Sequence, residues 1–173
     1  MNIRSILLAY ATRFGSTQEV AETITAALRQ AGFEIDMQPM REVKTLDNYG
    51  AVVLGAAIYN AKWHPDAHQF LSQHQEILSQ RPVAIFALGP LTSGAAPMRN
   101  SHRQLDKELA QYPWLKPVAL EIFVGKYDPA KPGLGFFERM MPARDHRDWA
   151  AIRAWAHALS AQLEHAEMSL RPA

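Results

Sequence analysis

The chain has 173 residues, of which 48% are hydrophobic, and this length and composition predict one domain with a sizeable core. It has no cysteine, which excludes disulfides and sulfur nucleophiles, and its 18 basic and 17 acidic residues nearly cancel, which disfavours nucleic-acid binding. No apolar stretch reaches the roughly 18 residues that span a bilayer, and Met1 to Tyr10 lacks the features of a signal peptide, so we expect a cytoplasmic protein.

Apolar runs bounded by glycine, proline or polar residues predict five strands. In chain order they are Ile3 to Tyr10, Ile35 to Met37, Ala51 to Ala56, Val83 to Leu88 and Val118 to Val124. Helical periodicity lies between and after them, at Thr17 to Ala31, Pro65 to Ser79, Met98 to Tyr112 and Trp149 to about Glu164. This alternation, with nearly continuous apolar strands, predicts an α/β fold with a parallel sheet between helices. No repeat or linker divides residues 1–173, so we expect a single domain.

A turn rich in hydroxyl groups joins the first predicted strand to the first predicted helix. Ser16 is followed three residues later by Glu19, a spacing that predicts a capping box with Ser16 as the helix N-cap. The turn holds more anion-binding groups than a cap needs: Thr12, Arg13, Gly15 and Thr17. Because the start of a helix attracts anions and ligands bind at the carboxyl ends of parallel strands, this turn predicts a phosphate site.

The common nucleotide motifs are absent. Neither GxGxxG nor GxxxxGK[ST] occurs, which removes the usual support for NAD(P), for FAD on a Rossmann unit and for ATP or GTP. No aspartate closes the first strand, where a phosphate-accepting response regulator would need one. The predicted phosphate site therefore suits a phosphate-bearing ligand other than these nucleotides.

Three segments resemble the flavin loops of the flavodoxins. Thr12 to Thr17 is similar to their phosphate loop, T/S-x-T-G-x-T, although Phe14 replaces a hydroxyl residue. Gly55 to His64, "GAAIYNAKWH", and Ala87 to Pro97, "ALGPLTSGAAP", resemble the second and third loops. Within this superfamily the chain most resembles the menaquinone-dependent protoporphyrinogen oxidases, which share T-R-x-G-x-T, the second loop and a D-W pair, here Asp148-Trp149.

This resemblance implies a flavodoxin-like three-layer sandwich, with five parallel strands in the order 2-1-3-4-5, that binds FMN. The implied FMN-binding residues are Thr12, Arg13, Phe14, Gly15, Ser16, Thr17, Ala57, Ile58, Tyr59, Asn60, Ala61, Lys62, Leu88, Gly89, Pro90 and Leu91. Either Tyr59 or Trp63 would lie against the flavin ring. His64 and His68 share a helical face, but no third ligand is evident, so we expect no metal.

The connection from residue 125 to 148 is far longer than the usual ~4 to 6 residues, and we treat it as an insertion. Its apolar residues share one face of a short predicted helix: Phe136, Phe137, Met140 and Met141. Basic residues flank that face: Lys131, Arg139 and Arg144. Two interpretations remain open. The face packs on the domain, or it forms a wall for a quinone or porphyrin or a peripheral contact at the inner face of the cell membrane.

The first functional hypothesis is an FMN-dependent oxidoreductase that passes reducing equivalents from a reduced substrate, with protoporphyrinogen IX of heme biosynthesis as the candidate, to a quinone. No catalytic side chain can be named, because the cofactor performs the redox step. The alternative is a non-enzymatic electron-transfer flavodoxin with a redox-protein partner, although a pI of about 8.1 disfavours an acidic shuttle. A flavin-free interaction module is a more remote alternative. The oligomeric state stays open.

Overall fold

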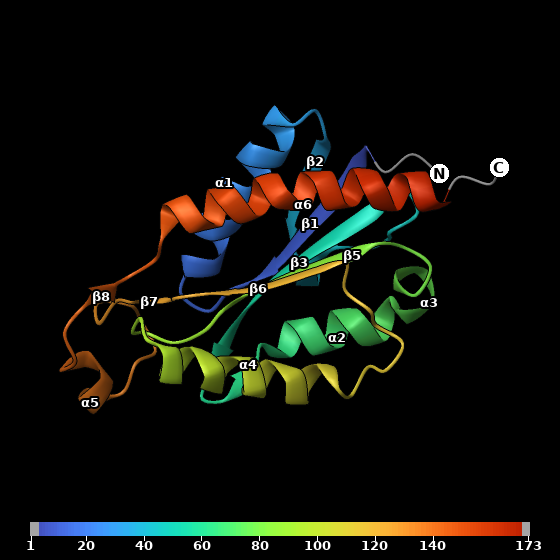
Figure 1. The fold of residues 1–173 in the computed structure, drawn as a ribbon. Coiled ribbons are helices and arrows are strands. Elements are labelled where there is room, and N and C mark those ends of the chain that lie inside the picture. The colour runs from blue at the N-terminus through green and yellow to red at the C-terminus, as the bar shows by residue number, and fades with distance from the viewer. Residues whose placement is uncertain (1–3, 171–173) are drawn as a thin grey trace.

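The computed structural model describes residues 4–170 and has a parallel sheet at its centre (Figure 1). The sheet runs in the order β2-β1-β3-β5-β6. These strands are β1 (Ser5–Ala11), β2 (Glu34–Pro39), β3 (Ala51–Tyr59), β5 (Val83–Leu88) and β6 (Ala119–Phe123). The predicted order 2-1-3-4-5 is confirmed, since the additional β4 (Lys62–Trp63) only pairs antiparallel with the end of β3. Ile3, where the first strand was predicted to start, lies outside the described residues.

Helices cover both faces of the sheet and complete the three layers (Figure 1). One face carries α1 (Ser16–Gln30) and α6 (Trp149–Leu170), and the other carries α2 (Pro65–Gln73), α3 (Gln75–Leu78) and α4 (Ala95–Leu109). The smaller elements are η1 (Met40–Glu42), β7 (Lys126–Tyr127), α5 (Phe136–Arg139) and β8 (Arg144–Asp145).

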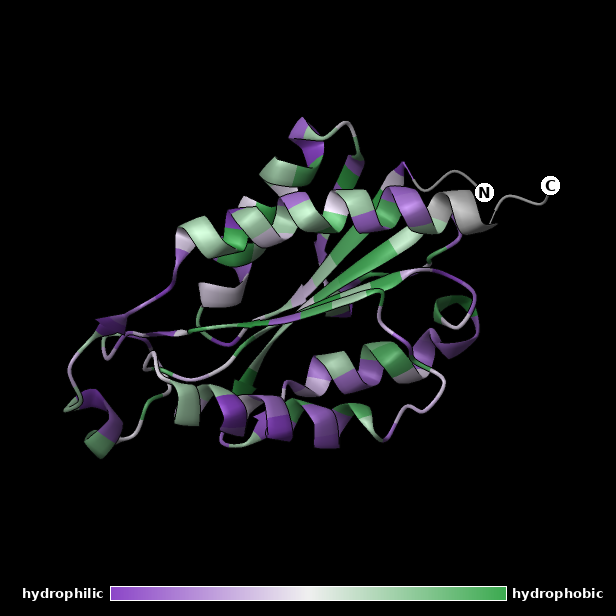
Figure 2. Cartoon of the chain, in the orientation of Figure 1, coloured by the Kyte–Doolittle hydropathy of each residue, from purple (hydrophilic) through white to green (hydrophobic). Residues whose placement is uncertain are grey.

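Alternate side chains of each central strand enter opposite halves of the core. In β1, Ile6 and Leu8 pack in the cluster beneath α1 and α6, whereas Leu7 and Ala9 pack in the cluster beneath α2 and α4. Figure 2 accordingly shows apolar strands between helices whose outer surfaces are hydrophilic. Because both faces of the sheet are covered, its carboxyl edge is where a ligand can reach the strand ends.

The predicted capping box at the start of α1 is wrong. Gly15 is the N-cap, with a left-handed φ of +90°, and Ser16 is the first helical residue. The carboxylate of Glu19 forms ion pairs with Arg147 at 2.7 Å and Lys126 at 3.5 Å. The Glu19 side chain, which a capping box requires, therefore pairs with residues of the insertion instead.

Three other helix boundaries differ from the sequence prediction. The helix predicted over Pro65 to Ser79 is interrupted at His74, whose backbone leaves the helical region. The helix predicted from Met98 starts at Ala95, because Pro97 lies in its first turn, where proline is tolerated. The last helix continues beyond Glu164 to Leu170.

The insertion lies beyond the carboxyl edge of the sheet, where β7 and β8 pair antiparallel and α5 projects outward (Figure 1). Arg147 joins it to α1, since its guanidinium, on a side chain only 2% exposed, pairs with Glu19 and with Asp145 at 2.6 Å. The same guanidinium lies 4.5 Å from the ring centroid of Trp149. The long connection is therefore anchored next to the turn after β1.

Candidate functional site

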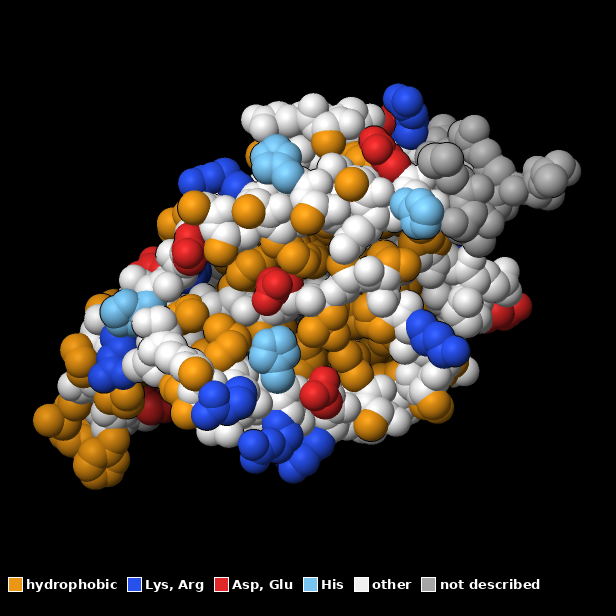
Figure 3. Space-filling model, viewed as in Figure 1, with side chains coloured by type: hydrophobic (Ala, Val, Ile, Leu, Met, Phe, Trp, Pro, Cys, Tyr) orange, Lys and Arg blue, Asp and Glu red, His pale blue; other side chains and the backbone are white. Residues whose placement is uncertain are grey.

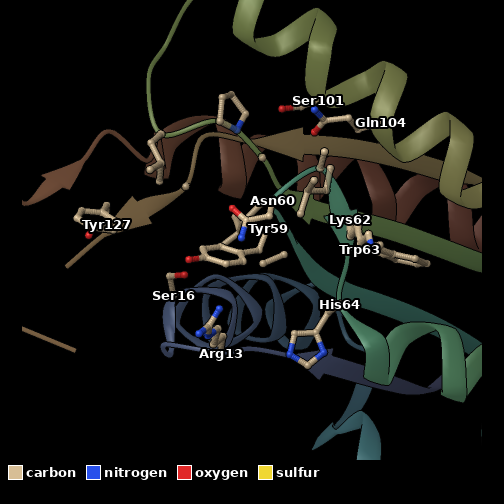
Figure 4. Close-up of a pocket in the computed structure, with 18 of the residues that line it drawn as sticks. Arg13, Ser16, Tyr59, Asn60, Lys62, Trp63, His64, Ser101, Gln104 and Tyr127 are labelled. Atoms are coloured by element: carbon tan, nitrogen blue, oxygen red, sulfur yellow. The ribbon is translucent and has the colours of Figure 1, made fainter. Parts of the chain in front are cut away.

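A cavity of about 800 Å³ lies where β1, β3 and β5 end (Figure 4). Its volume is within the ~300 to 1,000 Å³ typical of ligand pockets. Of the FMN-binding residues implied by the resemblance, all but Gly15 and Thr17 line it: Thr12, Arg13, Phe14, Ser16, Ala57, Ile58, Tyr59, Asn60, Ala61, Lys62, Leu88, Gly89, Pro90 and Leu91. The three segments far apart in sequence thus meet at one edge of the sheet.

The turn from Thr12 to Thr17 has the geometry of an anion site. The Gly15 amide donates to the Thr12 hydroxyl at 2.9 Å, which folds the turn beneath the start of α1. Thr17 is fully buried, and its hydroxyl has no hydrogen-bond partner among the described residues. Leaving such a hydroxyl unpaired costs about 1–3 kcal/mol, so a ligand oxygen at this helix start would satisfy it. The residues present therefore fit the phosphate of FMN, although Thr17 does not line the cavity.

Tyr59 lines the cavity together with other aromatic residues, Phe14, Trp63 and Tyr127. Its ring centroid lies 4.7 Å from the Arg13 guanidinium carbon and 6.3 Å from the Phe14 ring, which meets it edge-on. Its hydroxyl donates to the Glu138 carboxylate at 2.5 Å. That hydrogen bond raises the pKa of Tyr59 and lowers the pKa of Glu138. Tyr59 is thus held from one side by the phosphate-loop residues and from the other by α5.

The hairpin between β3 and β4 turns through Asn60 and Ala61, which have φ angles of +50° and +61°. Two consecutive left-handed residues form the turn that suits a two-residue hairpin, but alanine adopts this conformation at a penalty of roughly 1–2 kcal/mol. The turn places Asn60 at the centre of the cavity in Figure 4. Strain is often retained at functional sites, and here it shapes the second loop.

Trp63 does not take the place of Tyr59. Its side chain is 2% exposed and belongs to the core cluster beneath α2 and α4. Its indole meets the His68 ring edge-on at 5.9 Å, and its Nε1 has no hydrogen-bond partner among the described residues. Both aromatic residues that the sequence left open line the cavity, but Trp63 is buried in the core, whereas Tyr59 is only partly buried.

The two histidines that the sequence placed together have separate roles. His68 contacts Glu108 and the Tyr112 hydroxyl, each at 2.7 Å, and so links α2 to α4. His64 caps α2, because its Nδ1 accepts from the Asp66 amide at 3.2 Å. Burial lowers the pKa of His64, which favours a neutral ring with its proton on Nε2. No cluster of three or more metal-ligating side chains occurs within residues 4–170.

One wall of the cavity comes from residues that the sequence analysis missed. They project from α4 and are Pro97, Asn100, Ser101 and Gln104. Their spacing of three and four residues is the signal that could have identified them as one helix face. The other missed residues are Pro65, at the start of α2, and Gly125, Lys126 and Tyr127, which bring the first part of the insertion to the cavity.

The apolar face of the insertion is exposed. Phe136 is 74% exposed, Phe137 83%, Met140 71% and Met141 40%. The interpretation in which this face packs on the domain is therefore wrong. Figure 3 shows these side chains as a protruding apolar tip at the lower left, with basic side chains nearby. Within the described residues, none of the helices has the length and apolar character to cross a membrane.

Comparisons with known proteins agree with this geometry. The family model of the flavodoxin domain matches residues 7–143. Protoporphyrinogen IX dehydrogenase [quinone] of Escherichia coli strain K12 is 27% identical over 84 residues, which cover 47% of this chain and 46% of that protein. The chain thus spans about half the length of the curated relatives it matches.

Solved structures share the fold. The match to oxidised flavodoxin 1 from Bacillus cereus has a TM-score of 0.56 at 15% identity and covers 93% of this chain and 97% of that chain. Rubredoxin oxygen:oxidoreductase from Desulfovibrio gigas has a TM-score of 0.59 at 13% identity, with 94% of this chain and 36% of that chain covered. The chain belongs to the flavodoxin domain family, a flavoprotein family whose cofactor is FMN.

Proposed function

We propose that this protein is an FMN-dependent oxidoreductase that takes reducing equivalents from a reduced substrate and gives them to a quinone, with protoporphyrinogen IX as the candidate substrate. The observation that carries the proposal is the exposed apolar tip of α5, which is tied to the flavin-side residue Tyr59 through Glu138. An exposed apolar tip is suited to contact with a membrane or another protein, and contact with a membrane would bring the cavity to a lipid-soluble quinone. The partial similarity to an enzyme that bears protoporphyrinogen and quinone in its name supports the same assignment.

Different side chains would bind the phosphate and the ring of FMN. Arg13, Ser16 and Thr17 would hold the phosphate at the start of α1, where the helix dipole and free amides add to their attraction. Tyr59 would lie against the ring in a position fixed by Arg13 and Glu138. Bound FMN supplies the capacity to accept a hydride and to pass electrons on. The protein supplies orientation, and we assign no acid–base residue.

We also propose that the α5 tip contacts a membrane surface, because quinones of the respiratory type dissolve in lipid. The tip presents Phe136, Phe137 and Met140, and the exposed Arg139 lies in the same helix. Aromatic residues with neighbouring cations are suited to an anionic lipid interface. The contact would be peripheral and at the inner face of the cell membrane.

The substrate assignment is tested with the FMN-loaded protein, protoporphyrinogen IX and menadione under anaerobic conditions. We expect oxidation to porphyrin, followed by fluorescence, at a rate well above that of free FMN at the same concentration. A rate equal to the free-flavin control would refute the substrate. Rapid electron exchange with a redox protein in the absence of porphyrinogen oxidation would instead support the electron-carrier alternative.

The membrane contact has its own test. Replacing Phe136 and Phe137 by serine should abolish co-sedimentation with vesicles that contain anionic lipid. Val118→Ser is the matched control, since Val118 is also an exposed apolar residue, 38% exposed, outside the insertion. Equal sedimentation of all three proteins would contradict the proposal.

A further inference from the structure

The α4 side of the cavity presents uncharged polar groups that the loops described above do not use. Asn100, Ser101 and Gln104 line the cavity there. Figure 4 shows Ser101 and Gln104 projecting from α4 into the cavity, across from Arg13 and Ser16 at the start of α1. The cavity therefore has a polar α4 end as well as the α1 end where Arg13 lies, and Lys62 lines it from β4, which contacts α4.

The polar groups of this end have no protein partners within the part of the chain that the structure describes. Neither Ser101 nor Gln104 nor Asn100 makes a hydrogen bond through its side chain. Ser101 is nevertheless only 5% exposed, so bulk water reaches it poorly. The Ser101 hydroxyl is not fully enclosed, because it opens on the cavity, and a ligand there would supply it with a hydrogen-bond partner, whereas Asn100 is exposed.

Ser101 lies directly behind the third flavin loop. A Cβ atom added to Gly89 would come within 2.9 Å of the Ser101 hydroxyl and 2.7 Å of Ile122. Only glycine leaves room for this close approach of the loop backbone to α4. The Ser101 hydroxyl is thereby placed at the end of β5, next to the position where the resemblance puts the flavin ring.

Some backbone donors at this end are already used within the protein. The Gly89 amide donates to the carbonyl of Phe123 at 2.8 Å, and Pro90 has no amide hydrogen. The Gly125 amide donates to the Pro90 carbonyl at 2.8 Å. The side chains of α4 therefore add donors for a ligand carbonyl to those that the rest of the loop backbone offers.

We propose that Asn100, Ser101 and Gln104 form a subsite for the carbonyl edge of a planar, uncharged ring. Their amides and hydroxyl are donors and acceptors together, so they can donate to the carbonyls of either kind of ring and accept from the imide N–H of a flavin. The inference rests on the proposed function, which brings two such rings to the cavity. They are the pyrimidine ring of the flavin and the ring of the quinone.

The test compares Ser101→Ala, Gln104→Leu and the double variant with wild type. Arg103→Ala is the control, because Arg103 is exposed on the same helix and does not line the cavity. Apoprotein is titrated with FMN and with lumiflavin, which lacks the phosphate, and FMN-loaded protein is titrated with menadione. Thermal unfolding establishes that each variant is folded.

If the subsite holds the flavin, the double variant raises the Kd of both flavins about tenfold, as expected for the loss of two hydrogen bonds. The ¹³C shifts of the C2 and C4 carbonyls in labelled lumiflavin then move as well. If it holds the quinone, only the menadione Kd rises by this factor. Unchanged constants in a wild-type protein that binds flavin overturn the subsite alone, whereas a wild-type protein that binds none of the probes overturns the proposed function with it.

Discussion

Replacing Arg147 by methionine should detach the insertion from the start of α1. The Arg147 side chain is 2% exposed, and its guanidinium donates to both oxygens of Asp145, at 2.8 and 2.6 Å, and pairs with Glu19 at 2.7 Å. Methionine keeps most of the aliphatic packing but none of these charged hydrogen bonds. The variant therefore isolates the electrostatic contribution.

The expected loss is about 2–4 kcal/mol of unfolding free energy. Removing one partner of a fully buried ion pair costs about 3–5 kcal/mol. Here Glu19 and Asp145 are 44% and 41% exposed, so water partly replaces the arginine at both carboxylates. The remaining loss is that of charged hydrogen bonds, about 1.5–3 kcal/mol, with a further ~0.5–1 kcal/mol from the lost contact with the Trp149 ring.

Urea unfolding monitored by circular dichroism measures this loss as a shift of the midpoint at constant slope. Arg153→Met is the matched control, because Arg153 is exposed on α6, and we expect it to change the unfolding free energy by less than about 0.5 kcal/mol. If the two variants have the same midpoint, the Arg147 network does not anchor the insertion and our reasoning is refuted.

Three further predictions concern the cavity and its supports. Ala61→Gly should raise the unfolding free energy by about 1 kcal/mol in urea, because φ at this residue is +61°, whereas a lower stability would contradict the assigned turn. Gly55→Ala should lower it by about 1–3 kcal/mol, since the new Cβ would lie 2.0 Å from Phe86 Cζ, and Phe86→Leu in the same chain should recover part of the loss. Hydrogen bonding to Arg147 lowers the pKa of Asp145 from 3.8, so its contribution is complete above about pH 4 and is lost as the pH falls through the folded-state value. Asp145→Asn should therefore be less stable than wild type at pH 7 and equally stable in stronger acid, and a difference that persists at low pH would contradict this assignment.

The layers of the fold could be predicted because local patterns determine them. The central strands are buried on both faces, so their sequences are continuous apolar runs that no amphipathic helix would have. The strand order came from the resemblance to flavodoxins, since periodicity alone does not specify which strands are neighbours. The three loops that resemble flavin loops could be predicted because the apolar runs show where the strands end and the resemblance shows which of these ends carry the loops.

The errors arose where a distant residue decides a local choice. Ser16 and Glu19 have the spacing of a capping box, but Arg147, far along the chain, takes the Glu19 carboxylate. The sequence left Tyr59 and Trp63 as alternatives, because both follow a predicted strand and only the tertiary packing shows that the indole of Trp63 is buried in the core. Local sequence does not contain these competing partners.

The α4 face was missed for a different reason. Asn100 and Gln104 are polar residues at helical spacing, a pattern that normally indicates a face exposed to solvent. They line the cavity because α4 follows the third loop directly and lies against the end of the sheet. From sequence alone, a polar helix face that lines a pocket cannot be distinguished from one that is exposed to bulk solvent.

The insertion is part of the site. It is joined to the first loop through Arg147 and Glu19, which lies in the first turn of α1, and to the second loop through Glu138 and Tyr59. It also contributes Tyr127 to the cavity wall. The segment that carries the apolar tip of α5 therefore contacts two of the three loops that meet at the cavity. If a partner that binds the tip changes the affinity for flavin, then flavin changes the affinity for that partner by the same factor.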